Sequence, residues 1–362
     1  MKILILANDD EGLYQFRREL IVELVKKNEL YASVPEGPYK NDLISIGCKL
    51  EFADFNRHGT NPIRDFVLFC NYIKLIRKIK PDVVLTYTIK PNVYGGMACR
   101  LCKTPYLPNI TGLGTAVENG GFMQKLTLLL YKIALKKANC IFFQNSENER
   151  FMLDKGVIRG KHELIPGSGV NLNYFQKKEY PNDDKIVFSF ISRIMKEKGI
   201  EQFLGAAESI KAKYPNTEFH ICGYCEQDYE SKLIELDEKG IIIYHGCIRD
   251  VREMHAISHC TIHPTYYPEG LSNVLIESLS CCRPIITTDR SGCREVIDDG
   301  INGFLVKQKD TNDLIRVVEK FLNCSNDQRK AMGLAGRKKV EELFDRSIVV
   351  SKYIEAIDMI GK

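Results

Sequence analysis

The sequence predicts an α/β protein with two doubly wound parallel sheets, and three observations support this. Short apolar, β-branched runs alternate with amphipathic stretches from the first residue onward, which is typical of a parallel sheet with helices on both faces. The alternation occurs in two series, separated by residues 165–171, which hold one proline and two glycines. The length of 362 residues suits two domains better than one, and the composition, 44% hydrophobic and 27% charged, is that of a globular protein.

The predicted elements follow in order along each series. In the first series, strands are expected at residues 2–7, 31–34, 49–55, 82–86, 106–110 and 139–144, and helices at 14–27, 62–80 and 122–137. In the second series, strands are expected at 186–191, 217–222, 241–245, 260–263 and 284–288. We therefore expect two Rossmann-like domains, residues 1–166 and 167–345, that face each other across a cleft at the carboxyl ends of their strands. Residues 346–362 have no strand to pair with, so we expect a helix that packs across the domain junction.

The net charge of +4 is unevenly distributed between the two halves of the chain. Residues 1–170 hold 24 Lys and Arg against 17 Asp and Glu, whereas residues 171–362 hold 27 against 30. No helix-turn-helix, zinc-finger or RNP-type motif accompanies the basic half, so we expect no nucleic acid as a partner. An anionic membrane surface or an anionic substrate explains the charge better.

The sequence predicts no membrane span, no signal peptide, no disulfide and no metal site. No apolar run reaches the ~18 residues that span a bilayer, and acidic residues follow the first strand too soon for a signal peptide, so we expect a cytoplasmic protein. The 13 cysteines are odd in number, and the two C-x-x-C pairs fall in apolar elements, which indicates reduced thiols. His255 and His259 have the i, i+4 spacing of metal ligands, but no third ligand stands at a matching offset and the chain has no D-x-D motif.

The densest group of candidate site residues lies at 268–278, P-E-G-L-S-N-V-L-I-E-S, between two predicted strands. Gly270 and Ser272 can start a helix whose free backbone amides would form an anion site, at Ser272, Asn273 and Val274. Glu269 would stand in the loop at this helix end. Glu277 lies more than a turn into the helix, where a carboxylate can accept two hydrogen bonds from a ribose diol. The alternative for both glutamates is a solvated surface position.

A second group of candidate residues follows the predicted strand 186–191 at its carboxyl end. Arg193 and Lys198 are five residues apart across a turn, so both cations can converge on one dianionic leaving group. For an isolated R-x-x-x-x-K, exposed basic side chains would be the alternative.

These two groups, together with residues 292–306, G-C-R-E-V-I-D-D-G-I-N-G-F-L-V, resemble the retaining family-4 glycosyltransferases of GT-B fold. The resemblance extends over nearly the whole chain and is most specific between residues 193 and 306. It implies that Arg193 and Lys198 hold a nucleotide diphosphate and that Glu277 binds the ribose. It also implies that Glu269 and the amides of residues 272–274 bind the donor sugar and phosphate, with the base near residues 248–251.

The first half of the chain extends the resemblance. Residues 11–17 resemble the glycine-bearing loop of the family, where Gly12 would allow close approach to the donor diphosphate. Residues 86–92 and 109–114 resemble segments of bacterial transferases that extend polyprenyl-diphosphate-linked sugars, and α-1,3-N-acetylgalactosaminyltransferases of lipid-linked oligosaccharide assembly are the most similar type. Four residues are candidates to contact the acceptor or the donor sugar: Lys90, Asn109, Thr111 and Glu118. Lys90 is the first choice, because an acceptor that carries a diphosphate needs a cation.

The resemblance thus implies a retaining hexosyltransferase that needs no metal or other cofactor. It would move a sugar, an N-acetylhexosamine, from a UDP-sugar to a lipid-linked glycan acceptor in the assembly of capsule, another surface polysaccharide or a protein glycan. Charge that builds on the β-phosphate would be stabilised by Arg193, Lys198 and the helix amides. Two alternatives remain: a nucleotide-sugar 2-epimerase on the same fold, and a nucleotide-sugar-binding module without catalysis.

Two predicted helices of the first half favour peripheral contact with the anionic inner face of the cytoplasmic membrane. The helix at 122–137 is apolar through its middle and has no acidic residue, but it carries four lysines: Lys125, Lys132, Lys136 and Lys137. The helix at 62–80 has five basic residues against one acidic residue, Asp65. Each cation near anionic lipid contributes about 1 kcal/mol to adsorption. The alternative is that both helices pack on the sheet while their lysines are simply solvated.

Overall fold

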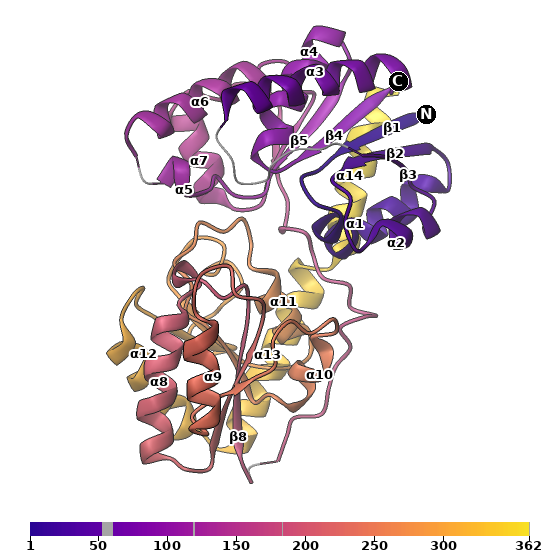
Figure 1. Cartoon of the computed structure of the whole chain (residues 1–362). Coiled ribbons are helices and arrows are strands. Elements are labelled where there is room, and N and C mark those ends of the chain that lie inside the picture. Colours follow the sequence, from indigo (N-terminus) through magenta and orange to yellow (C-terminus); the bar gives the residue numbers. More distant parts are fainter. Residues whose placement is uncertain (53–60, 119, 183, 362) are drawn as a thin grey trace. The chain divides into compact units, whose positions relative to one another are not determined.

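Figure 1 shows the computed structural model of the chain, which describes residues 1–52, 61–118, 120–182 and 184–361. The chain divides into two compact units. The first comprises Met1–Gly169, Pro268–Leu271 and Arg346–Lys362, and the second comprises Val170–Tyr267 and Ser272–Asp345. Each unit is built on a parallel sheet with helices between its strands, so the predicted fold class is confirmed.

The described residues of the first unit form a seven-stranded sheet in the order β3-β2-β1-β4-β5-β6-β7. The strands are β1 Lys2–Leu6, β2 Glu29–Val34, β3 Lys49–Phe52, β4 Val83–Tyr87, β5 Tyr106–Ile110, β6 Ile141–Phe143 and β7 His162–Leu164. All of these strands pair in parallel. In β1, Ile3, Leu4, Ile5 and Leu6 are fully buried. Burial on both faces explains why this strand is a continuous apolar run and does not alternate.

The helices of the first unit cover this sheet and include the last helix of the chain. They are α1 Asp10–Val25, α2 Lys40–Ser45, α3 Pro62–Ile79, η1 Pro91–Gly95, α4 Gly96–Cys102, α5 Thr115–Glu118, α6 Gly121–Leu135, α7 Ser146–Asp154 and α14 Arg346–Ile360. Val349 and Tyr353 of α14 pack in one hydrophobic core with β1, β2 and β4. At the start of α14, Arg346 donates hydrogen bonds to the Gly169 carbonyl and to Glu19. The helix is therefore an integral part of the first unit.

Within the second unit, the described residues form a six-stranded sheet in the order β10-β9-β8-β11-β12-β13. The strands are β8 Ile186–Ile191, β9 Thr217–Cys222, β10 Ile243–Tyr244, β11 Cys260–His263, β12 Ile285–Thr288 and β13 Gly303–Val306. The helices are η2 Lys196–Lys198, α8 Ile200–Lys213, α9 Glu230–Glu238, α10 Arg252–Ile257, α11 Asn273–Ser280, α12 Thr311–Leu322 and α13 Asn326–Leu343. Phenylalanine rings fill the core, and those of Phe188 and Phe219 stack with centroids 5.1 Å apart.

Each sheet reverses its strand order at one point. In the first unit the order reverses between β1 and β4, and in the second unit between β8 and β11. Loops that leave two such neighbouring strands run in opposite directions and leave a crevice at the carboxyl edge, where doubly wound sheets bind their ligands. These two edges are therefore the places to examine for a site.

Several element bounds differ from the prediction. The strands β7 and β13 were not expected, since each is short and lies next to turn residues. The helix expected at 14–27 begins earlier, at Asp10, because the Asp9 side chain caps it and two acidic residues occupy its first turn. Residues 53–55 of the strand expected at 49–55 lie outside the described residues. No helix in the described part of the chain has the length and apolar character needed to span a bilayer.

Candidate active site

Arg193 and Lys198 both lie near one tyrosine ring at the reversal point of the second sheet. Arg193 follows β8, and Tyr267 lies a few residues beyond the end of β11. The guanidinium carbon of Arg193 is 5.4 Å from the centroid of the Tyr267 ring, and Lys198 Nζ is 5.0 Å from it. Lys198 is only 8% exposed. The two cations predicted to act together therefore lie beside the same ring, and Lys198 is largely shielded from water.

Two glycines in left-handed or extended positive-φ conformations set the backbone around these cations. Gly199 has a φ of 81°, and a Cβ there would lie 2.2 Å from the Pro264 carbonyl oxygen. Gly223 follows β9, and a Cβ there would lie 1.8 Å from the carbonyl oxygen of Ser192. Any larger residue at either position would push the loop that carries Arg193 and Lys198 away from its neighbours.

An acidic residue that the sequence did not point to, Glu226, forms a salt bridge with Arg193. Burial of the guanidinium disfavours its charge, but Glu226 and Tyr267 outweigh that effect and hold the pKa of Arg193 above its ordinary value. Glu226 lies 33 residues farther along the chain, so no local pattern links it to Arg193. The cluster of Arg193 and Lys198 thus includes one negative charge, that of Glu226.

Four of the five histidines of the second unit, all but the exposed His245, are buried. Burial, and next to it the Lys198 charge, holds the pKa of His263 well below its ordinary value. Burial, followed by the charge of Arg283, lowers the pKa of His255 to about 3. Among the described residues, no group of three or more His, Cys, Asp and Glu side chains is arranged to hold a metal ion. The 13 cysteines are all free thiols.

The helix expected near residue 272 is α11, and Ser272 is its N-cap. The Ser272 side chain makes no capping hydrogen bond, as an open helix end requires. The expectation of a free Ser272 amide is wrong, however, because this amide donates to the Gly292 carbonyl oxygen at 2.8 Å. The candidate anion site of the helix is therefore reduced to the amides of Asn273 and Val274. Glu277 lies half-buried in the second turn of α11.

Glu269 lies in a different unit from Glu277. The segment Pro268–Leu271 belongs to the first unit, whereas α11 belongs to the second. The side-chain amide of Asn145 donates to the carbonyl oxygens of Glu269 and Gly270. Sequence reasoning missed Asn145, because nothing near residue 145 indicates a partner 124 residues away.

Gly12 does not lie in a loop, so the expectation for residues 11–17 is wrong. These residues form the first two turns of α1, and the Gly12 amide donates to the Asp9 side chain. A Cβ at Gly12 would lie 2.7 Å from Asp9 Oδ1. The glycine therefore leaves room for the helix cap, and the close approach it allows is to Asp9.

Lys90 follows β4 and forms an ion pair with Asp65 of α3, with 2.9 Å between Nζ and Oδ1. The Tyr94 hydroxyl donates to the other oxygen of Asp65 at 3.0 Å. Thr88, two residues before Lys90, has a φ of 68°. This conformation is costly for a β-branched residue, and such strain gathers at functional sites. Thr88 is a second residue that the sequence alone did not indicate.

The other three acceptor-side candidates lie in different settings. Asn109 is fully buried. Its side chain forms hydrogen bonds with Tyr353 and Gln144, so it has a structural role at the end of β5. Thr111 is half-buried just after β5. Glu118 is exposed at the end of α5. Of the four candidates, only Lys90 and Thr111 combine partial exposure with a position beside the carboxyl end of a strand.

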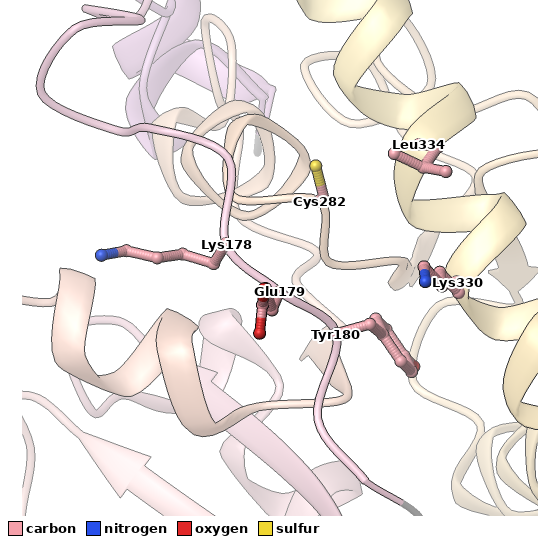
Figure 2. A pocket seen from close by; sticks show the side chains of 6 residues that line it. All are labelled: Lys178, Glu179, Tyr180, Cys282, Lys330 and Leu334. Atoms are coloured by element: carbon pink, nitrogen blue, oxygen red, sulfur yellow. The ribbon is translucent and has the colours of Figure 1, made fainter.

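Figure 2 shows a pocket of about 320 Å³ in the second unit that none of the predicted site residues lines. Its two lysines, Lys178 and Lys330, point to different sides and do not converge. The buried Arg283, which follows the lining residue Cys282, donates to the carbonyl oxygens of His255 and Glu179 and so ties these segments together. The pocket is lined by Lys178, Glu179, Tyr180, Cys282, Lys330 and Leu334. It lacks the converging polar groups typical of a ligand site.

Comparison with known proteins agrees with this geometry. Residues 2–145 match the family model described as Glycosyl transferase 4-like, and residues 173–339 match the one described as Glycosyl transferases group 1. The chain is 28% identical to the N,N'-diacetylbacillosaminyl-diphospho-undecaprenol alpha-1,3-N-acetylgalactosaminyltransferase of Campylobacter jejuni, with 100% of each chain covered. It is 26% identical to the UDP-Gal:alpha-D-GlcNAc-diphosphoundecaprenol alpha-1,3-galactosyltransferase of Escherichia coli, over 79% of this chain and 81% of that one.

Solved structures resemble the fold over its full length. The structure of Anabaena Alr3699/HepE in complex with UDP and glucose superposes with a TM-score of 0.82, at 17% identity, over 99% of this chain and 100% of that one. Its complex with UDP-glucose gives a TM-score of 0.81. At this identity the likeness shows the fold alone. The matches to two family models, which together cover most of the chain, and the two parallel-sheet units lead to one conclusion: the chain belongs to the glycosyltransferases of GT-B fold that these models describe.

Proposed function

We propose that this glycosyltransferase moves a sugar from a UDP-sugar to a sugar hydroxyl on a polyprenyl-diphosphate-linked acceptor, with retention and without a metal. The observation that carries this proposal is the pair Arg193 and Lys198 around Tyr267, at the point where the second sheet reverses its strand order. A site with two cations and an open helix end suits a diphosphate leaving group.

The chemistry assigned to these residues is electrostatic. The bond between the sugar C1 and the β-phosphate oxygen breaks, and its electron pair goes to that oxygen. Arg193, Lys198 and the amides of Asn273 and Val274 stabilise the charge that develops there. The acceptor hydroxyl oxygen forms the new bond to C1, and its proton passes to the departing phosphate oxygen. Glu277 binds the ribose, and Glu269 binds the donor sugar.

The substrate classes are supported by the names of the relatives. The Campylobacter jejuni relative is named for an undecaprenol-diphosphate-linked acceptor and an N-acetylgalactosaminyl group. The Escherichia coli relative is named for a UDP-Gal donor and a diphosphoundecaprenol-linked acceptor. A third relative, 25% identical over 79% of this chain and 80% of its own length, is a capsular polysaccharide biosynthesis glycosyltransferase of Staphylococcus aureus. We therefore favour a UDP-N-acetylhexosamine donor. Neither the epimerase nor the module without catalysis has support among these relatives.

The test is a donor and acceptor panel read by mass spectrometry. The purified protein is incubated with each of several UDP- and GDP-sugars and with polyprenyl-diphosphate-linked sugars from a membrane lipid extract. We expect one UDP-sugar to add a single hexosamine mass to a lipid-linked acceptor, and the product linkage to have the anomeric configuration of the donor. Transfer from GDP-sugars only, or to soluble acceptors only, would contradict the proposal.

We also propose that the first unit binds the inner face of the cytoplasmic membrane through α3 and α6. Both helices pack against α4 (Figure 1). Phe122 and Leu129 of α6 are 76% and 54% exposed, and Ile63 of α3 is 76% exposed. The four lysines of residues 122–137 are exposed as well. Exposed large apolar side chains beside lysines suit contact with an anionic bilayer.

Flotation with vesicles tests this contact. We expect binding to anionic vesicles at low salt that falls steeply by ~0.5 M salt, because each cation adds only about 1 kcal/mol and salt screens it. Binding should weaken in two variants: Lys125, Lys132, Lys136 and Lys137 changed together to Gln, and Phe122→Ser. The control is Lys211→Gln with Lys213→Gln on α8 of the second unit. Equal binding to neutral vesicles, or none, would contradict the proposal.

A further inference from the structure

The segment Pro268–Leu271 carries Glu269 and belongs to the first unit, although the residues on both sides of it belong to the second. Its position is therefore determined by contacts with the first unit. Those contacts come from the loops after β5 and β6, which end side by side in the first sheet.

The most specific of these contacts is made by Asn145, which is 1% exposed. Its Nδ2 donates to the Gly270 carbonyl oxygen at 2.6 Å and to the Glu269 carbonyl oxygen at 3.1 Å. Its Oδ1 accepts a hydrogen bond of 2.8 Å from the Asn148 amide and so caps α7. One side chain thus performs two tasks with different atoms: the amide nitrogen holds the segment, and the oxygen caps the helix.

Close packing fixes the segment on its other sides. A Cβ at Gly270 would lie 2.4 Å from both Gln144 Oε1 and the Thr111 carbonyl oxygen. Gly112 has a φ of 137°, and a Cβ there would lie 3.0 Å from the Pro268 carbonyl oxygen. The backbone on either side of Glu269 is therefore pressed against the first unit with no room for a side chain.

A buried network of amide side chains lies below this contact. Gln144 Nε2 donates to Asn109 Oδ1 at 3.3 Å, and Asn109 Nδ2 donates to the Tyr353 hydroxyl at 2.5 Å. Asn92 Nδ2 donates to the Asn109 carbonyl oxygen at 2.7 Å. Gln144 is thus held by a buried hydrogen-bond network, and Asn145 is the next residue in the chain.

We propose that Asn145 is a positioning residue that holds the Glu269 backbone in its working place, in addition to capping α7. This inference rests on the proposed function, in which Glu269 binds the donor sugar. A displacement of about 1 Å at a group that contacts a reacting substrate can lower turnover about 100-fold. Loss of the Asn145 donor should therefore reduce catalysis although Asn145 itself touches no substrate.

Asn145→Asp separates the two tasks. Aspartate is as good a helix N-cap as asparagine, so the cap of α7 is kept. The two carbonyl oxygens, however, lose their donor and face a carboxylate oxygen. Asn145→Ser is the second variant, because it keeps a capping oxygen, lacks the donor nitrogen and adds no charge. The matched control is Asn61→Asp, since Asn61 caps α3 by accepting from the amides of Ile63 and Arg64.

Three measurements on the full chain test the proposal: kcat and KM for the UDP-sugar, the affinity for free UDP, and hydrogen exchange of the amides of residues 269–271. For both Asn145 variants we expect kcat to fall, about 100-fold for Asn145→Asp. We also expect faster exchange confined to the segment, with unchanged UDP affinity. Asn145→Asp should lower the melting temperature, because it buries a carboxylate against two carbonyl oxygens, and Asn145→Ser, which adds no charge, should lower it less. Asn61→Asp should match the wild type in all respects.

Normal kcat in both variants would overturn the proposal, and so would a lower kcat without faster exchange at 269–271. A lower melting temperature with uniformly faster exchange would reduce Asn145 to its capping role and would also overturn it. A wild-type protein that transfers no sugar would refute the proposed function. In that case hydrogen exchange still decides whether Asn145 holds the segment.

Discussion

Replacement of Lys198 by methionine is the most direct test of the leaving-group site. Lys198 is nearly buried, and its Nζ lies against the Tyr267 ring. Methionine keeps most of the apolar stem and removes only the charge, so the packing around Tyr267 should survive. At ~4 Å and an effective dielectric constant of about 20, one charge contributes about 4 kcal/mol to a unit charge that develops beside it. Each ~1.4 kcal/mol is a factor of ten in rate, so we expect turnover to fall by about 100- to 1000-fold.

The assay is initial-rate transfer from the UDP-sugar at saturating donor, with UDP release as a second readout. The control is Lys196→Met, because Lys196 lies in the same short helix η2 but is exposed and is 3.6 Å from Glu201. We expect Lys196→Met to have nearly normal turnover and Lys198→Met to have a normal or higher melting temperature, since it removes a buried charge. If Lys198→Met loses less than about tenfold in turnover, the assignment of Lys198 to the leaving group is refuted.

Three further predictions concern other groups. Glu277→Gln should weaken the affinity for free UDP, whereas Glu269→Gln should leave it unchanged and lower turnover; calorimetry with UDP that gave the reverse would exchange the two roles. Activity should persist in excess EDTA, and a loss restored by Mg²⁺ or Mn²⁺ would reveal a metal requirement. Burial lowers the pKa of His255 from 6.5 to about 3, so the unfolded chain binds a proton there that the folded chain does not. The free energy of unfolding should therefore decrease by about 1.4 kcal/mol per pH unit as the pH falls from ~6.5 toward ~3, and His255→Leu, measured by urea unfolding across this range, should remove that slope.

The sequence predicted those features that local patterns determine. The strand β8 is a buried apolar run with basic residues directly after it, so the pattern alone indicated that Arg193 and Lys198 lie at a sheet edge. The start of α11 was also predictable, because Gly270 and Ser272 precede an apolar helical pattern. The prediction failed at Gly12. Asp9 caps α1, so the helix begins before Gly12, whereas the resemblance had predicted a glycine-bearing loop there.

Contacts between distant parts of the chain could not be predicted from one sequence. Glu226 pairs with Arg193, and Asp65 pairs with Lys90, only because parallel strands bring their loops to one edge. The Ser272 amide donates a hydrogen bond to the carbonyl oxygen of Gly292, which follows a different strand. The assignment of Pro268–Leu271 to the first unit depends on the geometry of Asn145, Gly112 and Gly270 together. No periodicity or spacing contains that information.

The place of α14 in the first unit has a consequence for how the chain folds during synthesis. Every residue of the second unit precedes Arg346, so the ribosome completes that unit before α14 is made. The strands of the first unit, by contrast, are synthesised before the second unit, but its core lacks Val349 and Tyr353 until α14 is made. Until then, Asn109 has no Tyr353 hydroxyl to which it can donate. Domains fold as units when their residues are available. The part synthesised first is therefore the last to be finished, and a nascent chain that stalls before residue 346 presents a complete second unit attached to a first unit with an open core.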